Sequence, residues 1–469
     1  MPFFYIDIAG RQCYSIFIYA GMGYPAQSAG GRLGFLFCRR FSWRGAAAGF
    51  LQKSRFGPHG AARYAISYII LHTLPVFKPV FLLHSRGKTE RTGSRALWPG
   101  RRERDGDEME KKTYKVGVVG ATGMVGQRFV SLLEHHPWFK LAAVAASARS
   151  AGKSYEEAVA GRWAMPTPLP ECAKSLTVLN AADVQAVAGQ VDFVFCAVDM
   201  KKEEIRALEE AYARAECPVV SNNSANRGTP DVPMVVPEIN AAHIEVIPAQ
   251  RRRLGTRRGF IAVKSNCSLQ SYVPALHPLM ADFGVKRVLV CTYQAISGAG
   301  KTFDSWPEML DNCIPYIGGE EEKSEQEPLK LWGKIENGQI LPAASPAITA
   351  QCLRVPVSDG HMAAVFVDFE RKPSKEEILA HWAAFRGPAQ ELGLPSAPKQ
   401  FLHYFEAPDR PQTRLDRDTE HGMAVCIGRL REDTQYDYKF VCLSHNTLRG
   451  AAGGGVLLAE LLAQKGYFD

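Results

Sequence analysis

The chain has 469 residues, of which 46% are hydrophobic and 22% charged, a composition that suits a globular protein of two or three domains. Its formal net charge of +8 is uneven, because residues 1–108 hold sixteen Lys or Arg and only six Asp or Glu. This segment therefore carries +10 and the remainder −2, which argues against a main body built to bind nucleic acid.

Residues 1–108 lack the marks of a folded domain. Their apolar runs are short, without a continuous helical or alternating period, and none reaches the roughly 18 to 20 residues that a membrane span needs. We expect a leader that is either disordered or translated from upstream of a natural start at Met109, and no membrane association. A transit peptide is the alternative, since such peptides are also basic.

The next segment predicts a nucleotide-binding turn. An apolar strand begins at Val116, glycines follow at 120, 123 and 126, and a helical pattern continues to Leu133. Glycines in such a turn let backbone amides at the helix start face a pyrophosphate and let the helix pack close to its strand. A tight turn with no ligand is the alternative.

The residues after the second predicted strand, 141–146, favour NADP over NAD. An NAD site usually has Asp or Glu here to bind the ribose hydroxyl, whereas this chain has Ser147, Arg149, Ser150 and Lys153. Hydroxyls and cations suit a 2′-phosphate, although a surface loop can be basic for solubility alone. A further strand at 191–198, a helix at 201–215 and a strand at 217–221 predict a parallel, doubly wound sheet.

Cys267 is the candidate nucleophile. It follows a strand that begins at Ile261 and precedes an apolar helix predicted at 269–280, and a helix N-terminus favours the thiolate. A buried cysteine beside a helix cap is the other interpretation. None of the eleven cysteines forms a C-x-x-C pair, so we expect reduced thiols of a cytoplasmic protein and no metal site.

Several motifs together resemble those of the aspartate-semialdehyde dehydrogenase family, over nearly all of residues 113–469. They are GATGMVG from Gly120, NCS from Asn266, YQAISGAG from Tyr293, IPYIGGEEEK from Ile314, RVPVSDGH from Arg354 and RPQTRLDR from Arg410. The GGEEEK motif is similar to the one in the branch of the family found in archaea and fungi. Leu269 departs from the threonine more usual there.

The resemblance implies an α/β chain with a Rossmann-type dinucleotide-binding domain and an α+β catalytic and dimerisation domain. The first would span residues 109–265 and be completed by the C-terminal helix at 446–469, and the second would span 266–445. It also implies a homodimer or homotetramer that makes lysine, threonine and methionine precursors by reducing 4-aspartyl phosphate to aspartate 4-semialdehyde.

In this family the cysteine attacks an acyl phosphate, phosphate leaves, and the nicotinamide reduces the resulting thioester. The carried-over roles are acid–base catalysis by His361, orientation by Gln294, carboxylate binding by Arg354, phosphate binding by Arg227 and Lys323, and ammonium binding by Glu320. A histidine titrating near neutrality suits the first role. Asn266 would support a substrate oxygen or cap the helix. The predicted cofactor contacts are Gly120, Thr122, Gly123, Met124, Val125, Gly126, Ser147, Arg149, Ser150, Ser297, Gly298 and Asn446.

Two alternative functions stand beside this one. An N-acetyl-glutamyl-phosphate reductase would share the thioester chemistry, but its acylated amine has no use for an ammonium-binding Glu320. A noncatalytic NADP-binding regulator would be expected to lack Cys267 or His361, and both stand in their motifs.

Overall fold

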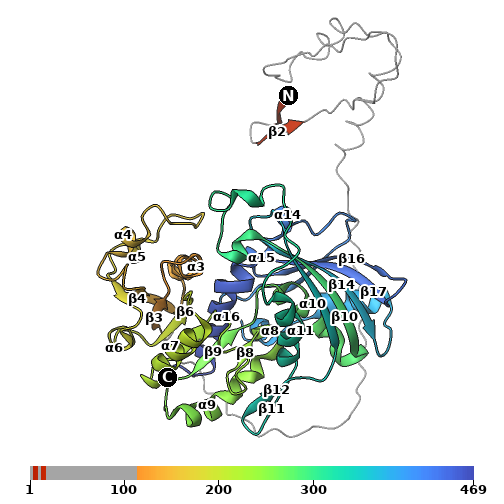
Figure 1. Ribbon diagram of the computed structural model, residues 1–469. Coiled ribbons are helices and arrows are strands. Elements are labelled where there is room, and N and C mark those ends of the chain that lie inside the picture. Colours follow the sequence, from red (N-terminus) through yellow and green to blue (C-terminus); the bar gives the residue numbers. More distant parts are fainter. Residues whose placement is uncertain (1–3, 9–11, 17–112) are drawn as a thin grey trace, which may run out of the picture. The chain divides into compact units, whose positions relative to one another are not determined.

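The computed structural model describes residues 4–8, 12–16 and 113–469, and the chain divides into two units, Met1–Glu103 and Arg104–Asp469. In the first unit, β1 (Phe4–Ile8) and β2 (Gln12–Ile16) pair as an antiparallel hairpin, drawn in red in Figure 1. The apolar runs of the leader did not predict this pairing. The other residues of the leader lie outside the described ones, so the expectations for residues 1–108 stay predictions.

The second unit begins with a seven-stranded sheet in which every pair is parallel, in the order β5-β4-β3-β6-β7-β9-β8. The order runs outward from β3 in both directions, which confirms the predicted doubly wound sheet. Its strands are β3 (Tyr114–Val119), β4 (Phe139–Ala146), β5 (Val178–Asn180), β6 (Phe193–Cys196), β7 (Val219–Ser221), β8 (Met234–Val235) and β9 (Ile261–Lys264). The helices among them are α3 (Met124–Leu133), α4 (Tyr155–Val159), α5 (Glu171–Lys174), α6 (Val184–Ala188), α7 (Lys202–Arg214), α8 (Pro237–Asn240), a 3-10 helix (Ala241–Val246) and α9 (Ile247–Leu254).

A six-stranded mixed sheet follows, in the order β13-β10-β14-β17-β16-β15. It confirms the predicted second, α+β domain. Its strands are β10 (Val285–Gln294), β13 (Ala347–Arg354), β14 (His361–Phe369), β15 (Leu402–Phe405), β16 (Val425–Glu432) and β17 (Tyr438–Ser444), and a hairpin is formed by β11 (Lys334–Glu336) and β12 (Gln339–Leu341). Its helices are α10 (Leu269–Phe283), α11 (Glu320–Leu331), α12 (Lys375–Ala384), α13 (Pro388–Glu391), α14 (Thr413–Asp416), α15 (Thr419–Gly422) and two 3-10 helices (Ile296–Ala299 and Pro307–Met309).

One face of this mixed sheet is covered by α10. Along β14 buried and half-buried residues alternate strictly, as expected for a strand with one face on a core, and α10 packs against β14, β16 and β17. The helix continues three residues beyond its predicted end, although Pro274 and Pro278 lie within it. Within residues 113–469 no helix combines the length and apolar character that crossing a membrane requires.

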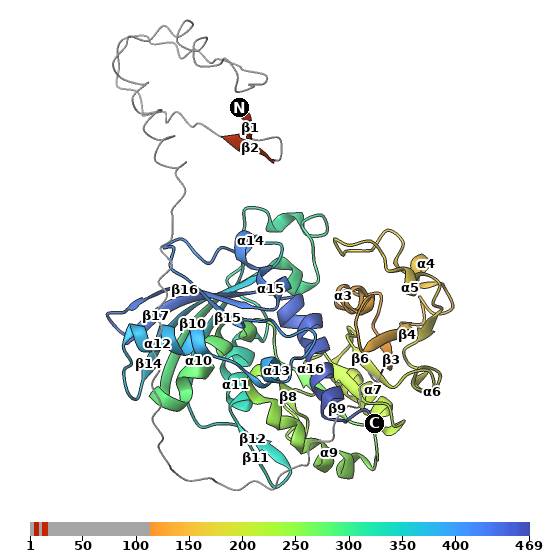
Figure 2. The ribbon, with the colours of Figure 1, turned by 180° about the vertical axis from the view of Figure 1, so that it is seen from behind.

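The last segment of the chain returns to the parallel sheet. A π-helix (Leu448–Ala452) leads into α16 (Gly453–Gln464), which packs against α3, β7 and β9. Figures 1 and 2 show this blue helix between the two sheets from both sides. Because α16 is buried almost throughout, its apolar composition is that of a helix surrounded by protein.

The strand register gathers the predicted site residues at one edge of the mixed sheet. Gln294 ends β10 and pairs directly with Arg354, which ends the parallel strand β13. His361 begins β14, which runs antiparallel to β10, and therefore lies at the same edge. Cys267 lies between the end of β9 and the start of α10, where the chain passes from the parallel sheet to the helix that covers the mixed sheet.

Candidate active site

The thiol of Cys267 faces the ring of His361. The Sγ atom lies 3.4 Å from Nε2, although 94 residues separate the two in sequence. Gly450, in the π-helix, packs against the same cysteine so closely that a Cβ there would lie 2.8 Å from the Cβ of Cys267. The structure therefore brings together the predicted nucleophile and the predicted acid–base residue, with the returning C-terminal segment against them.

The environment of His361 sets its tautomer. The backbone N–H of Ala295 donates to Nδ1 at 3.0 Å, so Nδ1 is the acceptor and the neutral ring carries its proton on Nε2, toward Cys267. Burial, and next the charge of Arg354, lower the pKa of His361 to about 3. The expectation of a histidine titrating near neutrality was wrong, because the ring is fully buried.

The thiol is also less acidic than its position at a helix start predicted. Burial, followed by the nearby Glu320 carboxylate, raises the pKa of Cys267, and the cations of Lys264, Arg227 and Arg354 offset only part of this. The site thus holds a thiol beside a neutral imidazole, and these two groups do not form a thiolate–imidazolium ion pair. The thiolate that was expected at the helix mouth needs further stabilisation, which the Nε2–H of His361 is placed to give.

Glu320 forms the anionic side of the site. Its carboxylate accepts hydrogen bonds from the side-chain amides of Asn266, at 3.0 Å, and Gln294, at 3.3 Å, and from Nζ of Lys323, at 2.7 Å. Burial acts to raise the pKa of Glu320, but Lys323 and the two amides outweigh it and lower the pKa. The residue is therefore ionised at neutral pH, as an ammonium-binding group must be.

Asn266 does more than support Glu320. Its Oδ1 accepts from the backbone N–H and the hydroxyl of Ser268, the residue just before α10, both at 2.7 Å, while its amide nitrogen contacts Glu320. Arg354, only 5% exposed, donates from one guanidinium nitrogen to the carbonyl of Ala295 at 2.7 Å. A Cβ at Gly298 would lie 2.8 Å from that nitrogen and 3.0 Å from Nε2 of His361, so the glycine keeps this pocket open.

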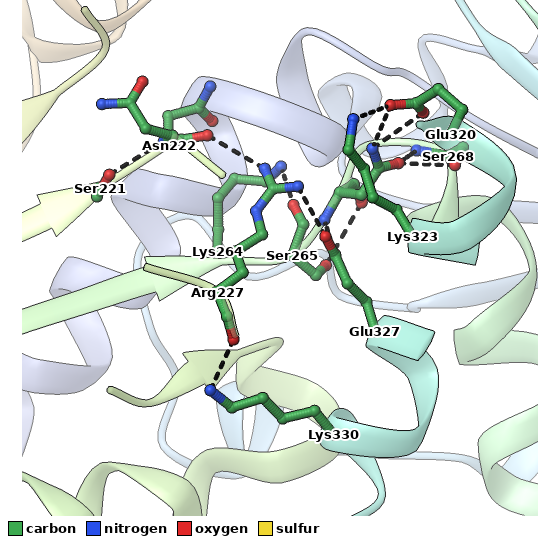
Figure 3. Close-up of polar contacts among 12 residues, drawn as sticks. Ser221, Asn222, Arg227, Lys264, Ser265, Ser268, Glu320, Lys323, Glu327 and Lys330 are labelled. Atoms are coloured by element: carbon green, nitrogen blue, oxygen red, sulfur yellow. Dashed lines mark hydrogen bonds and ion pairs between the residues drawn. The ribbon is translucent and has the colours of Figure 1, made fainter. Parts of the chain in front are cut away.

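Arg227 lies in a second cluster of charges, shown in Figure 3. Its guanidinium donates to Glu327 at 3.0 Å and to the carbonyl of Asn222 at 3.2 Å. The other oxygen of Glu327 accepts from the backbone N–H of Asn266 at 2.6 Å. Glu327 therefore links the predicted phosphate-binding arginine to the residue beside the nucleophile.

Sequence reasoning missed Glu327, Lys330 and Lys264. Nζ of Lys330 donates to three backbone carbonyls, of Arg227, Thr229 and Val232, and so fixes the loop that carries Arg227. The spacing of residues 320, 323, 327 and 330 puts all four charges on one face of α11, a signal that could have been found. Lys264 is a lysine that ends an otherwise apolar, buried strand, which is also visible in the sequence.

The predicted cofactor residues cluster at the start of α3 and in the loop after β4. Gly120 has a φ of +90°, and a Cβ on Gly126 would lie 2.1 Å from the Gly120 carbonyl oxygen, so these two glycines serve the turn and the packing of α3. Gly123 is exposed and caps α3 without a side-chain hydrogen bond, while Thr122, Met124 and Val125 are partly accessible. The first-turn amides therefore remain for a ligand, which fits a pyrophosphate.

The remaining predicted cofactor contacts divide by exposure. Ser147 and Arg149 are exposed, whereas Ser150 is buried, so the first two are the better placed for a 2′-phosphate. Asn446 is buried, with its oxygen accepting from the N–H of Gly360 and its nitrogen donating to the hydroxyl of Ser297, both at 2.8 Å. Asn446 thus connects the loop that ends at Gly360, next to His361, with the loop that contains Ser297. Within the described ranges no three His, Cys, Asp or Glu residues are grouped as a metal site.

Comparisons with known proteins identify relatives of this chain. Residues 115–247 match the family model described as the semialdehyde dehydrogenase NAD binding domain, and residues 276–449 match that of the semialdehyde dehydrogenase dimerisation domain. The chain is 44% identical over 352 residues to the aspartate-semialdehyde dehydrogenase of Archaeoglobus fulgidus, covering 75% of this chain and 98% of that one. It is 41% identical to the Saccharomyces cerevisiae enzyme, over 74% and 96% of the two chains.

A solved structure gives the same result. The crystal structure of aspartate semialdehyde dehydrogenase with NADP from Candida albicans is similar with a TM-score of 0.69 and 40% identity, covering 76% of this chain and all of that one. Two domain models, relatives above 40% identity over almost their whole length and a shared fold leave one conclusion: the chain belongs to the aspartate-semialdehyde dehydrogenase family.

Proposed function

We propose that this enzyme reduces 4-aspartyl phosphate to aspartate 4-semialdehyde with NADPH, through a thioester on Cys267. The reaction belongs to the synthesis of lysine, threonine and methionine. The observation that carries the proposal is the 3.4 Å approach of the Cys267 sulfur to His361, in a pocket that also holds the ionised Glu320. A nucleophile, a hydrogen-bond donor and groups for a charged amino acid are then present in one place.

In the first step the sulfur of Cys267 attacks the acyl carbon. The thiol proton is lost to solvent, the bond from carbon to the phosphate oxygen breaks, and phosphate leaves with the electron pair. Because Nε2 of His361 carries a proton, the ring donates a hydrogen bond to the sulfur and stabilises the thiolate before attack. It cannot also accept the thiol proton at that nitrogen.

In the second step the thioester is reduced. NADPH, when bound, supplies the hydride for the thioester carbon. The Nε2–H of His361 then donates to the oxygen of the tetrahedral intermediate, and collapse of that intermediate releases the aldehyde and the Cys267 thiolate. No net proton transfer is needed in this step, so a neutral histidine suffices.

The substrate is held by its three charged groups. Arg354 binds the carboxylate, Glu320 binds the ammonium, and Arg227 with Lys323 binds the phosphate. In the free enzyme Lys323 is paired with Glu320 and Arg227 with Glu327, so substrate binding exchanges these partners. Gln294, which reaches Glu320, orients the carbonyl group near the thiol.

The cofactor is NADP. The exposed first turn of α3, around Gly123, would hold the pyrophosphate, and Ser147 with Arg149 would hold the 2′-phosphate. We further propose that the enzyme is a homodimer or homotetramer of the cytoplasm. The match to a dimerisation domain supports the first part, and the nine cysteines of residues 113–469, all free thiols, support the second.

The rival N-acetyl-glutamyl-phosphate reductase activity is not favoured. A buried carboxylate that stays ionised through Lys323 and two amides is suited to a free ammonium, and an acylated amine carries no charge to pair with it.

A spectrophotometric assay of the reverse reaction tests the proposal, with aspartate semialdehyde, phosphate and NADP as reactants. Turnover should depend on phosphate, fall at least about a thousandfold in Cys267→Ala, and fall severely in His361→Ala. Cys172→Ala, which changes an exposed cysteine of α5, is the matched control and should behave as wild type. Undiminished turnover by Cys267→Ala would end the thioester mechanism, and a preference for N-acetyl-glutamate semialdehyde would transfer the chain to the rival activity.

A further inference from the structure

Lys264 is a buried cation that the mechanism above does not use. It ends β9, three residues before Cys267, and is only 2% exposed. Its Nζ donates to the backbone carbonyl of Ser265 (Figure 3). Lysine is almost never fully buried without a charged partner, because desolvating an ammonium group costs several kcal/mol or more. One neutral carbonyl does not offset that cost.

The neighbouring charges make the arrangement more unusual. Figure 3 shows the side chains of Lys264 and Arg227 reaching the same place from different segments. Arg227 is itself 8% exposed, and within the described part of the chain its Nε has no hydrogen-bond partner, nor has Oδ1 of Asn222. The carboxylate of Glu327 pairs with Arg227, and it acts on Lys264 only through its charge. An unpartnered buried N–H on a guanidinium indicates an acceptor that binds there.

We propose that Lys264 is a direct phosphate ligand, which completes with Arg227 a buried phosphate subsite next to Cys267. This inference rests on the proposed function and identifies a binding residue beyond those it names. The free enzyme is prepared for an anion at this point, and inorganic phosphate or the phosphoryl group of the substrate supplies it.

The charge balance of the pocket supports this role. Its charged groups are four cations and two carboxylates, namely Arg227, Lys264, Lys323, Arg354, Glu320 and Glu327. They leave a formal excess of two positive charges when Lys264 is protonated. The substrate carries one ammonium, one carboxylate and a phosphoryl group of about −1.5 to −2 near neutral pH, so its net charge is nearly the opposite. Without Lys264 the match would be poorer.

Phosphate binding should also be linked to proton uptake. Burial, and next the charge of Arg227, lower the pKa of Lys264 to about 7. The charge of Arg449, from the π-helix, also lowers this pKa, whereas Cys267 and Glu327 act to raise it. A phosphate anion beside the ammonium raises that pKa again. Above pH 7 the enzyme must therefore bind a proton together with the phosphate.

Two variants remove the charge in different ways. Lys264→Gln keeps an N–H donor for the Ser265 carbonyl, and Lys264→Met keeps only the volume. Lys334→Met, on the exposed strand β11, is the matched control. In the reverse assay we expect the KM for phosphate to rise about tenfold or more in both Lys264 variants, with the KM for the semialdehyde changed less than twofold.

Calorimetric titration of inorganic phosphate into the folded proteins provides a readout independent of turnover. In two buffers of different ionisation enthalpy at pH 8, wild type and Lys334→Met should show proton uptake beyond that of phosphate itself, and the Lys264 variants should not. Unchanged phosphate KM and affinity in Lys264→Gln would overturn the inference. An equal rise of both KM values would also overturn it, since that indicates a structural role. If wild type itself shows no phosphate-dependent turnover, the proposed function fails, and phosphate titration still tests the subsite.

Discussion

In the turn between β3 and α3, the groups available to a ligand belong to the backbone, whereas around Cys267 they are side chains from several separate segments. The turn needs glycine because any Cβ at Gly120 or Gly126 would meet backbone atoms. The Cys267 pocket needs particular charges, which come from the loop that carries Arg227 and from β9, α11 and β13. A site of the first kind depends on the local backbone conformation, whereas one of the second kind depends on contacts between segments far apart in sequence. Substitutions in the two regions should therefore have different effects.

The largest effect is expected where buried charges hold the π-helix. Arg449 is 1% exposed and donates to both oxygens of Glu238 on α8, at 2.6 and 2.5 Å, while its Nε contacts Gln270. Glu238→Ala leaves that guanidinium unpaired in the interior, which should cost about 3–5 kcal/mol in the free energy of unfolding. Urea denaturation monitored by circular dichroism measures it.

The control for this prediction is an exposed ion pair. Glu432→Ala breaks the contact with Lys372 at the surface, and the unfolding transition should scarcely move. If the two substitutions destabilise the enzyme equally, the Cys267 pocket does not depend on buried charge, and the contrast with the glycine turn is lost.

A smaller effect, confined to catalysis, is expected from Gly450→Ala. The new Cβ would lie 2.8 Å from Cβ and 3.2 Å from Cα of Cys267, so the nucleophile must shift. Because misplacement by about 1 Å can cost roughly a hundredfold in rate, kcat should fall about a hundredfold, with the KM for NADP nearly unchanged. Steady-state kinetics of the reverse reaction test this. Gly189→Ala, at the end of α6, is the control, and a loss of NADP affinity in Gly450→Ala would contradict the separation of the two regions.

The pH dependence of stability should reveal the charge held in the Cys267 pocket. The pKa of Lys264 is about 7 in the folded protein and 10.5 in its ordinary state. Between these values the unfolded chain binds a proton that the folded chain lacks, so stability rises with pH in that window. Relative to Lys264→Met, wild type should gain about 1 kcal/mol per pH unit between pH 7 and 9. Urea midpoints at three pH values measure the difference, and parallel curves would show that Lys264 keeps an ordinary pKa.

The sequence predicted the glycine turn and the alternation of strands and helices because those patterns are local. Val116, the glycines and the helix to Leu133 lie within twenty residues. The catalytic roles of Cys267 and His361 came from resemblance, since nothing local shows that residues 94 positions apart meet. The direct pairing of Gln294 with Arg354 depends likewise on parallel strand register.

Other features of the site depend on burial, which the sequence does not show. The low pKa of His361, its Nε2 tautomer and the raised pKa of Cys267 follow from the surroundings of those groups in the folded chain. The spacing of Glu327 from Glu320 and Lys323 shows that they share a face of α11, but only the packing of this charged helix shows that this face is enclosed. The residue types of this pocket can therefore be predicted from the sequence, whereas their protonation states cannot.

The smallest effect is expected in the loop after β4, where Arg149 is exposed. Arg149→Ala removes a cation that we expect to pair with the 2′-phosphate of NADP. Because solvent and salt screen an exposed contact, the KM for NADP should rise only about tenfold, or about 1.4 kcal/mol, and less at high ionic strength. The KM for NAD should stay the same, since NAD has no 2′-phosphate.

Kinetics with both cofactors at two salt concentrations measure this preference, with Lys174→Ala on the neighbouring helix α5 as the control. A rise in KM that is equal for NADP and NAD would mean that Arg149 maintains the shape of the loop. A rise for NADP alone, with kcat unchanged, would separate the two regions further. It would mean that exposed side chains choose the cofactor, the glycine turn binds the part common to NAD and NADP, and the charges around Cys267 act on the other substrate.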